Sequence, residues 1–143
     1  MRKIMTDILQ TAHFMGMDRV FFDKDTVDIE VAGYPKKDEQ GKGYSAYFNT
    51  VLMLAFHRYL RERRSPHYPG VLIIDSPLKG IDQGGVEAAG SMREGLFTYL
   101  MRKAADQQII IQENTDKVPG VDRDLVGNLI EFTKDPERAV TDI

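Results

Sequence analysis

A chain of 143 residues, of which 42% are hydrophobic and 29% charged, has the composition of one soluble globular domain. Because it contains no cysteine, disulfide bonds and thiolate metal sites are excluded. The formal net charge of −3 excludes a general attraction to nucleic acid, so any DNA contact would need a local basic patch such as Arg58–Arg64. No segment approaches the roughly 20 apolar residues that cross a bilayer, and the first residues lack the apolar core of a secretion signal. We therefore expect a cytoplasmic protein without membrane contact.

The first part of the chain predicts a helix and a β-hairpin. Between Thr6 and Met17 apolar residues recur at helical spacing, and Thr6 is a suitable N-cap. Residues 19–22 and Val27–Val31 are typical of two short strands, the second alternating apolar and charged side chains. The polar residues 23–26 between them predict the turn of a hairpin.

The remainder predicts a long helix followed by a strand–helix–strand unit. The first helix is expected over Ser45–Arg63, where a wide apolar face indicates packing under a sheet. Two buried strands, Val71–Ile74 and Ile109–Ile111, flank a second helix over Val86–Ala105, an order that is typical of a parallel sheet. A further strand is expected over Leu129–Thr133.

These elements predict an α/β fold in one domain over residues 1–143. Its mostly parallel sheet is flanked by helices in three layers, and the N-terminal hairpin forms an antiparallel edge or extension of that sheet.

The residues with candidate chemistry lie where the predicted strands end and where the long helix begins. Asp75 directly follows four apolar residues, so it is placed at the carboxyl edge of the sheet, where ligands bind in open α/β folds. The second strand leads into Glu113 and Asn114. The glycine-rich start of the long helix offers backbone N–H groups and a positive dipole end to a phosphate. Its candidate residues are Gly41, Lys42, Gly43 and Ser45.

This order of motifs, over residues 27–133, resembles the C-terminal half of an SMC-like head of the ABC-type ATPases, within the P-loop NTPase superfamily. In that family four apolar residues precede a Walker B and D-loop run of the pattern D-E-P-T-x-x-L-D. Asp75, Pro77 and Asp82 match this pattern, and Ser76 stands where the family has its catalytic glutamate. The glycine-rich helix start lies where the family has its signature loop. Glu113 and Asn114 lie where the family has its switch histidine.

The resemblance implies Mg²⁺ and ATP as cofactors and a role in DNA maintenance or repair. It makes Asp75 the metal-side catalytic residue and Glu113 a carboxylate that orients water or senses the γ-phosphate. The residues that would contact nucleotide are Gly41, Lys42, Gly43, Ser45, Ser76, Asp82 and Asn114.

One required motif is missing. The phosphate-binding loop G-x-x-x-x-G-K-[ST] does not occur, because Gly41-Lys42 is followed by Gly43 and is not preceded by a buried strand. The resemblance therefore implies a partner, either a separate Walker A-bearing lobe or another copy in a homo-oligomer, with DNA bound through the assembled head. The chain alone is expected to hydrolyse ATP very slowly or not at all.

Simpler interpretations stay open for each motif. Asp75 is equally able to cap the turn after its strand, Ser45 to cap the long helix, and Ser76 to serve as a turn residue before Pro77. Glu113 is then a solvated residue after a strand. On that interpretation the chain is a non-catalytic interaction or regulatory module, or a relic of an ATPase head.

Overall fold

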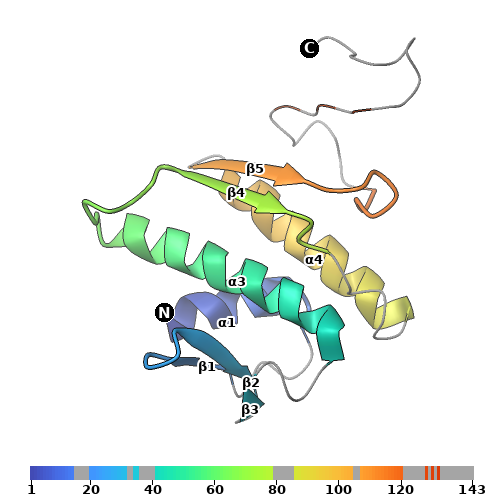
Figure 1. Ribbon diagram of the computed structural model, residues 1–143. Coiled ribbons are helices and arrows are strands. Elements are labelled where there is room, and N and C mark those ends of the chain that lie inside the picture. Colours follow the sequence, from blue (N-terminus) through green and yellow to red (C-terminus); the bar gives the residue numbers. More distant parts are fainter. Residues whose placement is uncertain are drawn as a thin grey trace.

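The computed structural model describes residues 1–14, 20–31, 34–35, 41–78, 86–104, 107–120, 128, 130 and 132. Within these ranges the chain forms three helices and two small sheets, an α/β arrangement (Figure 1). The helices are α1 (Arg2–Thr11), α3 (Gly41–Glu62) and α4 (Val86–Ala104). The strands are β1 (Val20–Asp23), β2 (Asp28–Val31), β3 (Tyr34–Pro35), β4 (Val71–Asp75) and β5 (Gln108–Gln112).

The predicted parallel pairing is confirmed. β4 pairs with β5 in parallel, from Val71 opposite Gln108 to Asp75 opposite Gln112, and α4 provides the crossover between them. In β4 the side chains of Leu72 and Ile74 are buried, whereas Ile73 between them is exposed. One face of this two-stranded sheet is therefore covered and the other is open.

The predicted hairpin is also confirmed, but its place in the fold is different. β1 and β2 pair antiparallel, and the short strand β3 adds to β2. Asp23 shapes the turn, because its carboxylate accepts hydrogen bonds from the N–H of Asp25 (2.9 Å) and the hydroxyl of Thr26 (2.7 Å). The prediction that this hairpin extends the parallel sheet is wrong, since it forms a separate sheet that packs on α1 and α3. Phe22 of β1 contacts Phe56 of α3, with ring centroids 5.4 Å apart.

The helices form the middle of the molecule. In Figure 1 β4 and β5 lie on one side of α3 and α4, and α1 with the hairpin lies on the other. This position explains the wide apolar face of α3, which must pack on β4 and on α1 at once. The expectation of helices on both faces of the parallel sheet is not met by the described residues, whose helices cover one face.

The core is continuous between α1, α3 and α4. Its largest fully buried side chains are Met5, Ile8 and Leu9 of α1, Tyr47, Phe48, Val51 and Leu54 of α3, and Leu96 of α4, with Val20, Ile29 and Leu78 beside them. Phe14, just after α1, packs edge-on against Phe48 with ring centroids 5.2 Å apart. The N-terminal helix is therefore part of the core, and not an appendage to it.

The bounds of α1 differ from the prediction over Thr6–Met17. The helix starts four residues earlier because Ile4 and Met5 are buried, so Thr6 is not its N-cap. It ends in a Schellman motif, in which the N–H of Phe14 donates to the carbonyl of Leu9 and His13 adopts a left-handed φ of 53°.

α3 also begins earlier than predicted, at Gly41 instead of Ser45. It ends in the same way as α1, with Arg64 at a φ of 49° and the N–H of Ser65 donating to the carbonyl of Leu60. The strand expected over 129–133 lies outside the described residues apart from Ile130 and Phe132. No described helix has the length and apolar character needed to cross a membrane.

Candidate functional site at the carboxyl edge of the parallel sheet

Two of the predicted site segments meet because the parallel strands end together. Asp75 closes β4 and Gln112 closes β5 in register, so the residues that follow each strand emerge at the same edge. The N–H of Ser76 continues the ladder by donating to the carbonyl of Gln112 at 2.8 Å. The structure thus brings together Asp75 and Ser76 from one strand with Glu113 and Asn114 from the other.

Asp75 and Ser76 form a local hydrogen-bonded pair. The hydroxyl of Ser76 donates to Oδ1 of Asp75 at 2.8 Å. Ser76 has a φ of 53°, a left-handed conformation that non-glycine residues rarely adopt. This turn directs the chain away from the sheet immediately after the carboxylate, and the hydroxyl fixes one of its oxygens.

Glu113 links the ends of the two strands. Its Oε2 accepts a hydrogen bond from the N–H of Leu78 at 3.0 Å, and its Oε1 accepts one from the N–H of Asn114 at 2.9 Å. Because Leu78 is fully buried, this carboxylate fixes the loop after β4 against the end of β5. Each carboxylate oxygen has a second lone pair, so a water molecule can still bind to Glu113 without breaking these bonds.

Asp75 is exposed at the end of β4 and is chemically suited to a cation that keeps its water. Across the described ranges no group of three or more acidic or histidine side chains gathers to hold a metal. Mg²⁺ fits this arrangement, because it is commonly held by one or two carboxylates together with waters and substrate phosphates. Asp75 would hold such an ion, with its Oδ1 oriented by Ser76.

The predicted phosphate-contacting residues lie in the first turns of α3. Gly41, Lys42 and Gly43 belong to the helix, and Ser45 lies one turn in and is half-buried. The interpretation of Ser45 as the helix cap is therefore wrong. In Figure 1 the start of α3 lies at the same end of the molecule as the end of β4. Asp82 lies outside the described residues.

A second polar cluster was missed by the sequence analysis. Arg58, which the sequence places in the basic patch Arg58–Arg64, has a side chain that is only 22% exposed. It forms an ion pair with Asp7 of α1, donates to Glu62 at 2.7 Å, and lies 3.5 Å from the hydroxyl of Tyr99 in α4. Burial disfavours the charged guanidinium, but these three partners outweigh it and raise the pKa of Arg58.

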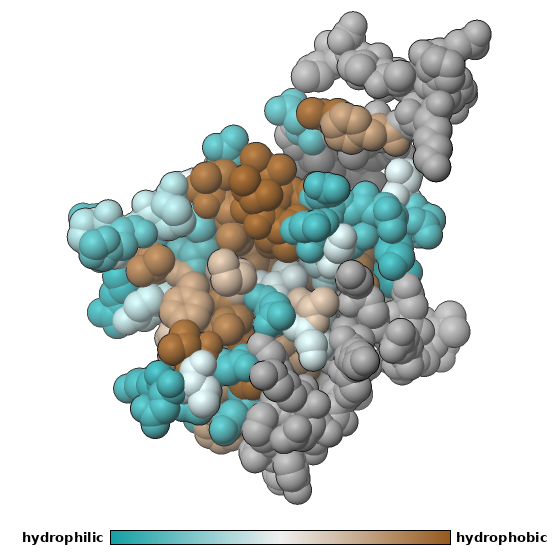
Figure 2. Space-filling model, in the orientation of Figure 1, coloured by the Kyte–Doolittle hydropathy of each residue, from teal (hydrophilic) through white to brown (hydrophobic). Residues whose placement is uncertain are grey.

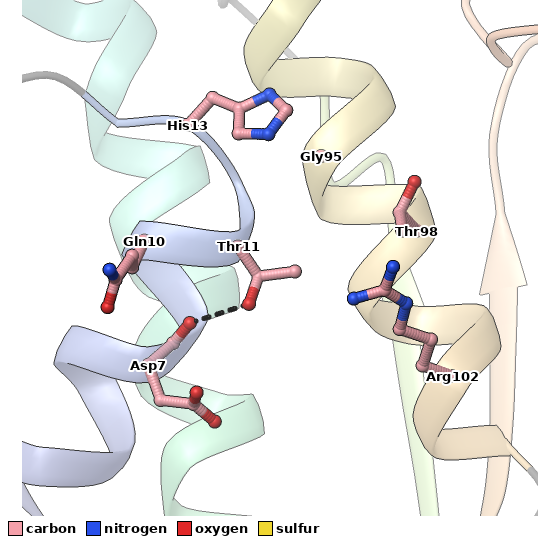
Figure 3. Close-up of a pocket in the computed structure, with 7 residues that line it drawn as sticks. All are labelled: Asp7, Gln10, Thr11, His13, Gly95, Thr98 and Arg102. Carbon is pink, nitrogen blue, oxygen red and sulfur yellow. Dashed lines mark hydrogen bonds between the residues drawn. The ribbon is translucent and has the colours of Figure 1, made fainter.

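This cluster ties all three helices together, and it borders a groove between α1 and α4 with a volume of about 210 Å³. No sequence signal could have found it, because Asp7 and Arg58 are 51 residues apart. The groove is lined by Asp7, Gln10, Thr11, His13, Gly95, Thr98 and Arg102 (Figure 3).

His57 is buried within the fold. It is 3% exposed, its Nδ1 lies 3.0 Å from Oε1 of Gln107, and its ring centroid is 4.7 Å from that of Tyr68. Burial lowers its pKa, since the charged imidazolium would lose its hydration there.

Neither a protein-family model, nor a curated protein, nor a solved structure matches this chain significantly. The function is therefore inferred from the residues and geometry of the chain itself.

Proposed function

We propose that this chain is the C-terminal nucleotide-binding lobe of an SMC-like ATPase, acting with a separate Walker A-bearing lobe in ATP-dependent DNA maintenance or repair. The observation that supports it best is the pairing of β4 with β5 in parallel, with Asp75, Ser76, Glu113 and Asn114 gathered where both strands end. This is the edge at which α/β folds bind their ligands.

The incomplete cover of the sheet supports a missing lobe. Parallel sheets are found almost only where both faces are covered. Here Ile73 is 68% exposed and Ile110 is 46% exposed. Figure 2 shows hydrophobic surface in the region where Figure 1 draws β4 and β5. Among the described residues no segment covers these isoleucines, and a partner lobe would supply that cover.

The exposure also indicates the side on which cover is lacking. On the inner face of the sheet Leu72 and Ile74 of β4 are buried, whereas Ile109 and Ile111 of β5 are only half-buried. The packing under the sheet therefore weakens from β4 towards β5. A partner lobe placed along β5 and over the outer face would bury the apolar groups that the described residues leave open.

The proposed division of chemistry follows from the residues present. Asp75 would hold hydrated Mg²⁺, and the first turn of α3 would offer backbone N–H groups to a phosphate. Ser76 cannot act as an effective general base, because a neutral hydroxyl group accepts a proton too weakly. The phosphate-binding loop, and with it most of the affinity for ATP, would come from the partner lobe.

Calorimetry of Mg²⁺–ATP binding tests this proposal. The chain alone is expected to show no measurable heat of binding, and an equimolar mixture with a Walker A-bearing lobe of an SMC-like head is expected to bind. Asp75→Asn should weaken that binding at least about tenfold, because the metal loses one charged ligand. The matched control is Asp116→Asn, which removes an exposed carboxylate from the loop beyond β5. Absence of binding in the mixture, or equal binding by both variants, would refute the nucleotide site.

A second candidate function is a non-catalytic interaction module, favoured by Ser76 and by the structural use of both Glu113 oxygens. The same mixture, followed by light scattering after size-exclusion chromatography, distinguishes the two. A stable complex that binds no nucleotide, and that Ile73→Lys disrupts, would favour the interaction module. A complex that requires ATP would favour the nucleotide-binding lobe.

A further inference from the structure

The groove between α1 and α4 has two differently shaped ends. Near its upper end in Figure 3 the helices touch, because a Cβ placed on Gly95 would lie 2.6 Å from the Cα of Ala12. Beyond Gly95 the helices diverge, and the gap of about 210 Å³ opens between Thr11 on one wall and Thr98 and Arg102 on the other. At about 30 Å³ per water molecule this space holds roughly seven waters, or one molecule of the size of a small amino acid.

The two walls carry opposite charges that do not neutralise each other. Asp7 and Arg102 line the same groove, yet in the described part of the chain they form no ion pair with each other. Asp7 instead forms an ion pair with Arg58 through Oδ2, which leaves Oδ1 directed to no described donor. Arg102 makes no hydrogen bond to another described residue, and Figure 3 shows its guanidinium directed into the gap.

The polar groups between these charges are able to bind a ligand. Thr98 is half-buried and lines the gap, and its hydroxyl makes no hydrogen bond to any described side chain. Thr11 donates its hydroxyl proton to the carbonyl of Asp7 at 2.9 Å, so its oxygen is left as an acceptor. His13 closes the upper end, with Nδ1 placed 3.0 Å from the hydroxyl of Ser91.

We propose that this groove binds a small zwitterion of the α-amino-acid type. The carboxylate of the ligand pairs with the guanidinium of Arg102 and accepts a hydrogen bond from Thr98. Its ammonium group donates to the free oxygen of Asp7 and to the hydroxyl of Thr11. A planar guanidinium is the side chain best matched to a carboxylate, and the opposite charge on the facing wall selects a ligand that has both charges. This inference is independent of the nucleotide site.

Two-dimensional amide NMR of the full chain tests the proposal with L-alanine as the probe. We expect saturable shifts of the amides of residues 7–13 and 95–102, with a Kd of about 1 mM or below. Acetate and methylammonium each have only one of the two charges, so each should bind at least about tenfold more weakly than L-alanine.

Two variants test the assignment of the residues. Arg102→Gln should weaken L-alanine binding at least about tenfold, and Thr98→Val should weaken it by a smaller factor. Arg63→Gln is the matched control, because it removes an exposed guanidinium that lies over Tyr59, away from the groove, and it should leave Kd unchanged. The amide spectrum itself reports whether each variant is folded.

Three results would overturn the proposal. Shifts that rise linearly to high L-alanine concentration would show that no site exists. Acetate binding as tightly as L-alanine would show an anion site without use of Asp7. Equal affinity of Arg102→Gln and Arg63→Gln would show that the guanidinium takes no part.

Discussion

The contact between α1 and α4 at Gly95 allows a sharp test of the packing. A Cβ at this position would lie 2.6 Å from the Cα of Ala12, 2.6 Å from the carbonyl oxygen of Thr11 and 2.7 Å from the carbonyl carbon of Ala12. All three are backbone atoms, so no side-chain rotation relieves the clash. To restore an ordinary contact of at least 3.4 Å, the end of α1 must move away from α4 by about 0.8 Å.

The expected cost follows from that displacement. Inserting one methyl group into a well-packed interior costs about 1–3 kcal/mol of the free energy of unfolding. Alanine also favours the helix over glycine by about 1 kcal/mol, which partly conceals this cost. Gly90→Ala measures this gain in helix propensity alone, because Gly90 lies in the same helix with no atom within 4 Å of its Cβ position. The difference between Gly95→Ala and Gly90→Ala should therefore be about 1–3 kcal/mol, close to the packing cost alone.

Urea denaturation followed by circular dichroism measures this difference. Gly90→Ala should unfold at the wild-type midpoint or slightly above it, and Gly95→Ala at a midpoint about 1 M lower than Gly90→Ala. Equal midpoints for the two variants would refute the close contact between the helices.

Three further predictions concern the polar groups of the core and its edge. Glu113→Ala removes the acceptor for the buried N–H of Leu78 and should lower the free energy of unfolding by about 1–3 kcal/mol in urea denaturation; no loss would show that water replaces the carboxylate. Burial lowers the pKa of His57, so as pH falls through 6.5 the unfolded chain binds a proton at this residue before the folded chain does. The free energy of unfolding should therefore be highest above that pH, and it should decrease below it until the pKa of the folded state is passed. His57→Gln should flatten this dependence of the urea midpoint on pH, and an unchanged profile would contradict the assignment. Arg58→Lys loses the planar guanidinium that contacts Asp7 and Glu62 together, and it should lower the free energy of unfolding by about 1–2 kcal/mol. The difference between the variant and the wild type should be smaller in 1 M NaCl, because salt screens the ion pairs.

The parts of the fold with local sequence signals were predictable. A run of four apolar residues that ends in Asp75 defines a strand and its direction, and the helix between two such runs predicts their parallel pairing. The meeting of Asp75 with Glu113 follows from that pairing, because parallel strands of equal length end together. The hairpin was predictable for a similar reason, since the polar residues 23–26 separate two short strands.

The parts that failed depend on contacts between distant residues. The end of α1 is set by His13 in a left-handed conformation, and histidine gives no such signal in the sequence. In the sequence Arg58 is one of several arginines near a helix end, and only the fold brings Asp7 and Tyr99 to it from two other helices. At the parallel sheet the local pattern itself gave the wrong expectation. An unbroken apolar run predicts a strand that is covered on both faces, but Ile73 in that run is 68% exposed.

The crossover through α4 also has a consequence for synthesis. β4 is synthesised well before β5, its only neighbour in the described sheet. Leu78 and Glu113, which join the ends of the two strands, are 35 residues apart in the chain. At a translation rate of about 5–20 residues per second, β4 waits roughly 2–7 s with both edges unpaired. In that interval α3, which precedes it on the nascent chain, is the element available to shield Leu72 and Ile74. Because α3 is made before β4, it can cover the apolar side of β4 early, before neighbouring chains that are being translated from the same mRNA can bind to it.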